Sequence, residues 1–184
     1  MMRREPRFNE RKREYEENVL EINRISRTVA GGRRIRFRVL IVIGDRKGKV
    51  GIGVGKAPDI AEAVKKARLT AEKHLMVIPL KNGTIPSEIR VNYGASKIVL
   101  KPARPGKSII AGSAVRTIVN LSGIENISAK ILGSDSKINN AKAMMVALKK
   151  LKEVNERIQS RRLNRPKVLV SEKELKNEVS KDKK

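Results

Sequence analysis

The sequence predicts an α+β protein made of two small units in tandem. Between residues 34 and 55 apolar and polar residues alternate, which is typical of strands with one buried face. From residue 60 to residue 75 apolar residues recur every three or four positions, which is typical of an amphipathic helix. A second succession of strand and helix patterns follows residue 86, so we place the boundary between the two units near Ile85-Pro86.

The first unit is predicted to begin with a strand and a hairpin. Residues 19–29 allow a first strand. In the next strand five apolar residues share one face and three arginines share the other: Ile35, Phe37, Val39, Ile41 and Ile43 against Arg34, Arg36 and Arg38. Residues 44–48 predict a tight turn, and residues 49–55 the return strand.

Three glycines, Gly51, Gly53 and Gly55, share one face of the predicted return strand and allow another group to approach its backbone closely. A nucleotide-binding loop is one interpretation. However, the dinucleotide-binding motif G-x-G-x-x-G would need a third glycine, which is missing here. A P-loop would need glycine in place of Val50 and Ser or Thr in place of Ala57. The row is therefore expected to serve close packing or the approach of RNA. The sequence leaves open whether it meets RNA or the second unit.

A helix is predicted after this hairpin. Pro58 suits the first helical position, and Asp59 suits the positive end of the helix dipole. The residues expected to face inward are Ile60, Val64, Ala67, Ala71 and Leu75. Residues 77–80 are predicted as a further strand, so that the first unit is a small sheet covered by one helix.

The second unit is predicted to contain strands at 88–93, 97–101 and 124–132. A helix is expected to begin near Ala111 and to be capped by Gly123. A longer helix is expected over 138–158, with Ala141, Met145, Leu148 and Leu151 inward. The predicted organisation is a basic extension, a first domain, a second domain and a charged tail: 1–18, 19–85, 86–160 and 161–184. Ser171 and Glu174 form a possible capping box in the tail.

The composition indicates a polyanionic partner. The chain has 43 Lys and Arg against 19 Asp and Glu, a formal net charge of +24. No apolar run reaches the roughly 18 residues that a spanning helix needs, which favours nucleic acid over a membrane. Aromatic residues make up only 2% of the chain, so we expect contacts with phosphate, sugar and groove shape rather than base stacking.

The basic residues that are candidates for binding nucleic acid gather in and around the first hairpin. The alternative interpretation is that they only form a solvated face, which is the usual role of a run of charges. Against it, Asp45 is the only carboxylate between residues 23 and 56, and like charges this dense repel one another unless an anion lies between them.

Catalytic and metal sites are not predicted. Cysteine is absent and His74 is the only histidine, so a zinc site is implausible. No acid–base pair or phosphate-binding loop is recognisable, and we expect no cofactor. A small nucleotide-dependent enzyme and a general DNA-packaging protein are the disfavoured alternatives.

Several sequence blocks then carry a family resemblance. They are NRISRTV at 23–29, GGR at 31–33, GKVG at 48–51, LKPA at 100–103, IIAG at 109–112 and LGS at 132–134. In order and spacing they resemble the family of bacterial small-subunit ribosomal protein five. The resemblance implies a three-stranded, double-stranded-RNA-binding-like unit with one helix. It also implies a second α/β domain of two layers, whose fold alone does not indicate catalysis.

The resemblance implies a structural protein of the cytoplasmic ribosome. It would bind small-subunit ribosomal RNA, touch ribosomal proteins four and eight, and border the messenger-RNA entry path. It would also affect decoding accuracy, and its loop from Arg27 to Arg33 would approach the spectinomycin site. The predicted RNA-binding residues are Arg24, Arg27, Thr28, Gly31, Gly32, Arg33, Arg34, Arg36, Lys47, Lys49 and Lys56. The residues expected to face protein four are Pro105, Gly106, Lys107, Ser108 and Arg116.

The chain departs from the family pattern at a few positions. Ala30 stands where the family usually has lysine, and Ile52 and Val54 stand where larger aromatic residues are frequent. These differences bear on local contacts and on drug response.

Overall fold

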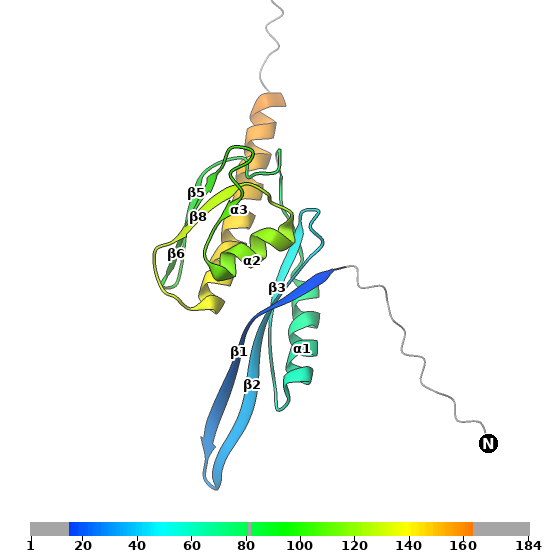
Figure 1. Ribbon diagram of the computed structural model, residues 1–184, viewed down its shortest axis with the longest axis vertical. Helices are drawn as coiled ribbons and strands as arrows, with labels where there is room; N and C mark the ends of the chain where they lie inside the picture. Colours follow the sequence, from blue (N-terminus) through cyan, green and yellow to red (C-terminus); the bar gives the residue numbers. More distant parts are fainter. Residues whose placement is uncertain (1–14, 81, 164–184) are drawn as a thin grey trace, which may run out of the picture. The chain divides into compact units, whose positions relative to one another are not determined.

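The computed structural model describes residues 15–80 and 82–163 (Figure 1). The described chain divides into two compact units, one ending at Glu153 and the other beginning at Val154. Both sheets lie in the first of these units. The domain limits predicted from the sequence stay a prediction.

The first sheet is antiparallel and has four strands in the order β1-β2-β3-β4. They are β1 (Glu16–Val29), β2 (Gly32–Gly44), β3 (Lys49–Ala57) and β4 (Met76–Val77). The α+β class is therefore confirmed. The sheet has one strand more than the three that the resemblance implies. The predicted strand over 77–80 forms as the short β4, which begins one residue earlier and ends at Val77.

Helix α1 (Ile60–Lys73) covers one face of this sheet. It begins two residues after Pro58, the predicted first helical position, because Asp59 is its N-cap. The Asp59 carboxylate caps it by accepting a hydrogen bond from the backbone N–H of Ala61 at 3.2 Å. The predicted inward face was partly wrong, since Ile60 is 40% exposed. Ala67 and Ala71 are fully buried as predicted, and Ala63, which was not predicted, is the third fully buried residue of α1.

The glycine row of β3 explains this alanine face. A Cβ at Gly51 would lie 2.5 Å from the carbonyl oxygen of Ala71, and Cβ atoms at Gly53 and Gly55 would overlap carbonyl oxygens of the same helix. Backbone therefore packs on backbone, and only small side chains fit between helix and strand. The row therefore serves the close packing that the sequence allowed, and the segment that covers it is α1 rather than the second half of the chain.

The second sheet has the order β5-β6-β8-β7, with β7 parallel to β8 and the other pairs antiparallel. Its elements are β5 (Ile89–Tyr93), β6 (Ser96–Pro102), β7 (Ile109–Ile110), α2 (Ser113–Ser122), β8 (Ile127–Ile131) and α3 (Lys137–Leu163). Each predicted strand and helix is present, and β7 is additional. Gly123 ends α2 at φ 80°, as predicted. The capping box at Ser171 lies outside the described residues.

Strand β2 contributes to two hydrophobic clusters because its side chains alternate between the faces of the sheet. Val39, Ile41 and Ile43 pack against α1. Leu40 and Val42 instead join the larger cluster, which includes Ile118 of α2 and Leu148 of α3. The larger cluster therefore joins both sheets into one core.

Candidate nucleic-acid interface

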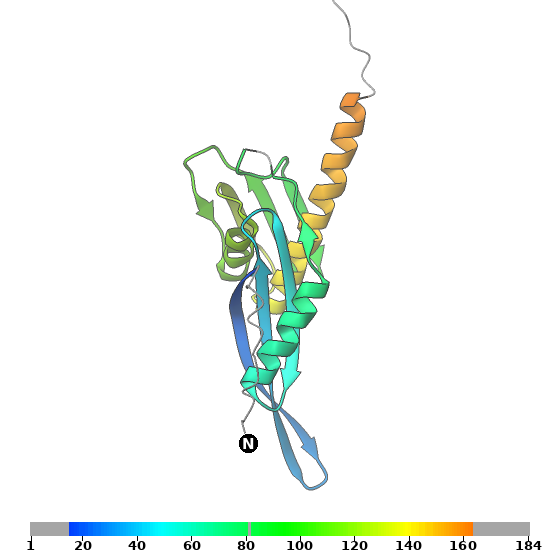
Figure 2. The ribbon, with the colours of Figure 1, turned by 90° about the vertical axis from the view of Figure 1, so that its right-hand side faces the viewer.

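The β1–β2 hairpin extends beyond the rest of its sheet. β1 pairs with β2 along its whole length, to Val29 opposite Gly32. β3 pairs with β2 only between Phe37 and Gly44. Residues 25–36 therefore form a two-stranded projection, which we call the arm, and both Figure 1 and Figure 2 show it continuing past the end of β3 and the start of α1.

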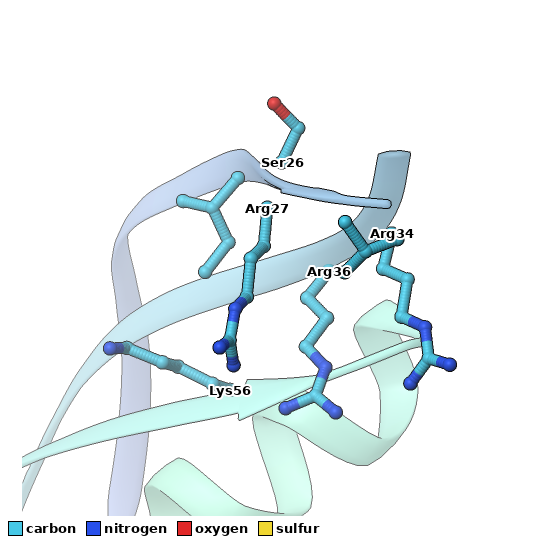
Figure 3. A pocket seen from close by; sticks show the side chains of 7 residues that line it. Ser26, Arg27, Arg34, Arg36 and Lys56 are labelled. Carbon is cyan, nitrogen blue, oxygen red and sulfur yellow. The ribbon is translucent and has the colours of Figure 1, made fainter. Parts of the chain in front are cut away.

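Four basic residues share the face of the arm and sheet that is turned away from α1. Arg27 lies directly opposite Arg34 on the neighbouring strand, and Arg36 is two residues further along the same face of β2. Lys56 follows Gly55, which packs on α1, so its side chain projects from the other face. Figure 3 shows the guanidinium groups of Arg27, Arg34 and Arg36 on one side of the hairpin and the Ser26 hydroxyl on the other.

These side chains line a shallow hollow with a cavity volume of about 250 Å³. Sites for small organic ligands are typically about 300–1,000 Å³ and largely apolar. The hollow is smaller than such sites and basic rather than apolar, and Arg27, Arg34, Arg36 and Lys56 are all exposed. The geometry suits successive phosphate groups of a polymer better than an enclosed ligand.

Within the part of the chain that the structure describes, no carboxylate pairs with this basic face. Within the described ranges, no ion pair involves Arg27, Arg34, Arg36 or Lys56. Arg38 continues the row toward the core, opposite Lys56, and its Nε atom is buried without a hydrogen-bond partner in the described chain. The positive charge of the row is therefore available to an external anion.

The other predicted RNA-binding residues lie on the opposite face of the hairpin, at its tip, and at the far end of β2. Arg24, Thr28 and Arg33 project from the opposite face of the hairpin, since Thr28 pairs with Arg33 and Arg24 pairs with Phe37. Gly31 and Gly32 form the tip, where Gly32 has a φ of 141° that glycine tolerates. All five residues are exposed, so the arm is basic on both of its faces.

Lys47 and Lys49 lie at the far end of β2 from the arm tip. The sequence placed them with the arm arginines because all belong to one hairpin, but the thirteen residues of β2 separate the two ends, a span of about 40 Å. Their backbone N–H groups donate to Asp45 Oδ1 at 2.7 and 2.9 Å. The structure therefore does not bring these lysines together with Arg27, Arg34 and Arg36.

Comparison with known proteins shows which family the chain belongs to. The N-terminal domain model of ribosomal protein S5 matches residues 15–79, and the C-terminal domain model of the same protein matches residues 91–162. The chain belongs to the ribosomal protein S5 family. The resemblance drawn from the sequence blocks is confirmed.

Individual members of the ribosomal protein S5 family are similar in sequence to this chain over most of its length. The small ribosomal subunit protein uS5 of Thermus thermophilus is 52% identical over 139 residues, 76% of this chain and 86% of the relative. The uS5c protein of Pyropia yezoensis is 45% identical over 148 residues, 80% of this chain and 85% of the relative. The uS5 protein of Synechococcus sp. (strain RCC307) is 46% identical over 145 residues, 78% and 66% of the two chains.

Membership in the ribosomal protein S5 family identifies the chain as a structural protein of the small ribosomal subunit and not an enzyme. Its location is the cytoplasmic ribosome. The described residues contain no group of three His, Cys, Asp or Glu side chains placed to hold a metal ion. Of the helices that the structure describes, none is both long and apolar enough to cross a membrane.

The loop predicted to face protein four lies between β6 and β7. Pro105, Gly106, Lys107 and Ser108 are all exposed, and the backbone N–H of Ser108 donates to Asn126 Oδ1 at 3.1 Å. Arg116 is also exposed, in the first turn of α2. No hydrogen bond in the described chain joins the side chain of Arg116 to the loop, so the two are exposed independently of each other.

The sequence missed three residues that line the hollow, namely Ile25, Ser26 and Val29. Ile25 could have been found, because it lies two residues before Arg27 and therefore on the same strand face. It supplies an apolar floor beside the guanidinium groups. Val29 could have been found in the same way, because it lies two residues after Arg27. Ser26 carries no such signal, since strand alternation directs its side chain away from that face.

Proposed function

We propose that the chain binds small-subunit ribosomal RNA and that the arm is its principal contact. The observation that carries this proposal is the exposed row of Arg27, Arg34, Arg36 and Lys56, for which residues 15–80 and 82–163 supply no ion-pairing carboxylate. Like charges at this spacing repel one another within the folded protein. A phosphate backbone that follows the row would offset that repulsion, and a stabilising role inside the protein would not explain the charges.

The proposed recognition uses phosphate groups and the shape of folded RNA. Residues 25–36 contain no aromatic side chain on which a base could stack. The arm is a narrow two-stranded element that is basic on both faces. It is therefore suited to lie between RNA segments and to contact phosphates on either side.

The resemblance supports finer roles that we also propose. They are support of subunit assembly, a position beside the messenger-RNA entry path, an effect on decoding accuracy and contacts with ribosomal proteins four and eight. The exposure of Pro105 to Ser108 and of Arg116 supports a contact with protein four. The tip at Gly31-Gly32 is proposed to lie near the spectinomycin site. We also retain 19–85 and 86–160 as the proposed domain limits.

Salt-dependent titration of the purified chain against folded small-subunit ribosomal RNA tests the RNA-binding proposal. Replacing Arg34 and Arg36 with alanine is expected to weaken binding and to lower the slope of log affinity against log salt by about two. The matched control replaces Lys65 and Lys73, two exposed lysines of α1, and should change the slope much less. Equal slopes for the arm variant and the unmodified chain would disprove the arm's contact with phosphate.

Replacing Lys47 and Lys49 in the same titration decides whether the β2–β3 turn also contacts RNA. A slope lowered by about two would place phosphates at both ends of β2. An unchanged slope would restrict the interface to the arm.

A further inference from the structure

An apolar groove lies at the edge of the first sheet opposite to β1. Its floor is formed by Ile52, Gly53 and Val54 of β3, and β4 closes one end with Met76 and Val77. Met145 of α3 and the last turn of α1 form its walls, and its cavity volume is about 670 Å³. Its volume lies within the range of about 300–1,000 Å³ that is typical of binding sites, and most of its lining is apolar.

The floor of the groove is an open strand edge. β4 pairs with β3 only at Lys49 and Val50. From Gly51 to Ala57, β3 has β2 on one side and no strand of the described chain on the other. Alternate residues of an antiparallel strand direct their N–H and C=O groups toward such an edge, which makes it a template for an added strand.

The rim of the groove is basic. Lys142 and Lys152 of α3 line it and are exposed. No carboxylate lines it among the described residues. An occupant that carries acidic side chains at the rim and apolar ones over Val54 and Val77 would complement this surface in charge and in polarity.

We propose that the groove binds an extended, acidic and apolar segment of a partner protein, which adds as a strand beside β3. RNA fits less well, because the floor is aliphatic and offers neither aromatic platforms nor a line of cations for phosphates. A second copy of the chain fits less well too, because two molecules of formal net charge +24 repel each other. This inference goes beyond the proposed RNA contact and does not depend on the arm.

Photocrosslinking in assembled small subunits tests the proposal. Val77 is 56% exposed at the end of the groove, and Leu69 is 58% exposed on α1 outside it. Each is replaced in turn by p-benzoyl-phenylalanine, the chain is assembled into small subunits, and the crosslinked products are identified by mass spectrometry. The proposal expects the Val77 probe, and not the Leu69 probe, to capture one acidic protein segment. Capture of RNA, of a second copy or of a segment without acidic residues overturns it, as does a yield no higher than that at Leu69.

A synthetic peptide of the captured segment provides the second measurement. The double variant Lys142→Glu and Lys152→Glu is expected to bind the peptide about tenfold more weakly than the unmodified chain, since two attractions become repulsions. The control variant Lys65→Glu and Lys130→Glu, at two exposed lysines that do not line the groove, carries the same change in net charge and should bind as the unmodified chain does. Backbone amides of β3 should also exchange hydrogen more slowly with peptide bound. Equal affinities for the two double variants, or unchanged exchange in β3, would refute the proposed strand addition.

Discussion

Gly53 of β3 lies directly against Ala67 of α1, so closely that a Cβ at Gly53 would overlap the carbonyl oxygen of Ala67. The same Cβ would lie 2.6 Å from the backbone nitrogen of Ala71. Both of these clashing atoms belong to helix backbone, which cannot move aside as a flexible side chain does. The close approach of helix and sheet therefore requires glycine at Gly53, as it does at Gly51 and Gly55.

Gly53→Ala is expected to lower the free energy of unfolding by about 1–3 kcal/mol, because the added methyl group forces α1 away from the sheet. Denaturant unfolding measures this change. Gly31→Ala is the control, since nothing lies within 4 Å of a Cβ there and its φ is not positive; its effect should stay within about 0.5 kcal/mol. Equal effects of the two substitutions would contradict the packing argument.

Gly123→Ala is expected to destabilise the junction between α2 and the β2–β3 turn. Gly123 has a φ of 80°, and a Cβ there would lie 2.6 Å from the carbonyl carbon of Arg46. The substitution therefore costs about 1–2 kcal/mol for the left-handed conformation, plus the cost of the clash. It would also weaken the hydrogen bond from the Arg46 N–H to the Leu121 carbonyl, which measures 3.0 Å.

Gly94→Ala is the control that separates the cost of the left-handed conformation from the cost of the clash at Gly123. Gly94 also has a positive φ, 55°, but nothing lies within 4 Å of a Cβ there. Its substitution should show the conformational cost alone, so unfolding measurements should find Gly123→Ala clearly more destabilising. A smaller effect at Gly123 than at Gly94 would show that the turn tolerates displacement.

Arg27→Glu is expected to separate stability from RNA binding. Arg27 faces Arg34 directly across the β1–β2 ladder, so glutamate would replace a repulsive pair with an attractive one. The free energy of unfolding should stay unchanged or rise by up to about 1 kcal/mol, while affinity for ribosomal RNA falls. Unfolding and salt titration of the same preparation measure both quantities. A variant that lost stability together with affinity would show that Arg27 acts through the fold of the arm.

Asp59→Ala is expected to cost about 1 kcal/mol of stability, because the N–H of Ala61 loses its capping acceptor. Asp59→Asn keeps an oxygen in the same position and should retain most of that stability. Thermal or denaturant unfolding distinguishes the two variants. If asparagine proved as costly as alanine, charge at the helix end rather than the hydrogen bond would be responsible.

Much of the fold could be predicted from the sequence because its signals are local. Strand alternation placed Val39 and Ile41 on one face of β2, and a lone glycine marked the end of α2 at Gly123. The two-residue strand β7 is too short for periodicity to identify, and β4 was expected only with other bounds, since both strands exist only through their partners. The β3 edge groove depends on segments distant in the chain and had no sequence signal.

The candidate site shows the same division. Charge counting found Arg27, Arg34 and Arg36, because their excess over carboxylates is visible along the chain. It also grouped Lys47 with them, although β2 holds Lys47 at the opposite end of its sheet. Nearness in sequence is a poor guide to nearness in space along an extended strand, where each residue adds about 3.3 Å.

By itself the sequence determined that this protein is basic, α+β and a member of a ribosomal family, since composition, periodicity and motif blocks are properties of the linear chain. Tertiary structure alone decided which surfaces meet. The Gly51, Gly53 and Gly55 row receives α1, β2 divides its side chains between two clusters, and β3 keeps an open edge. The reason is physical: periodicity shows that a face must be buried, but the shapes of the packed segments select the neighbour that buries it.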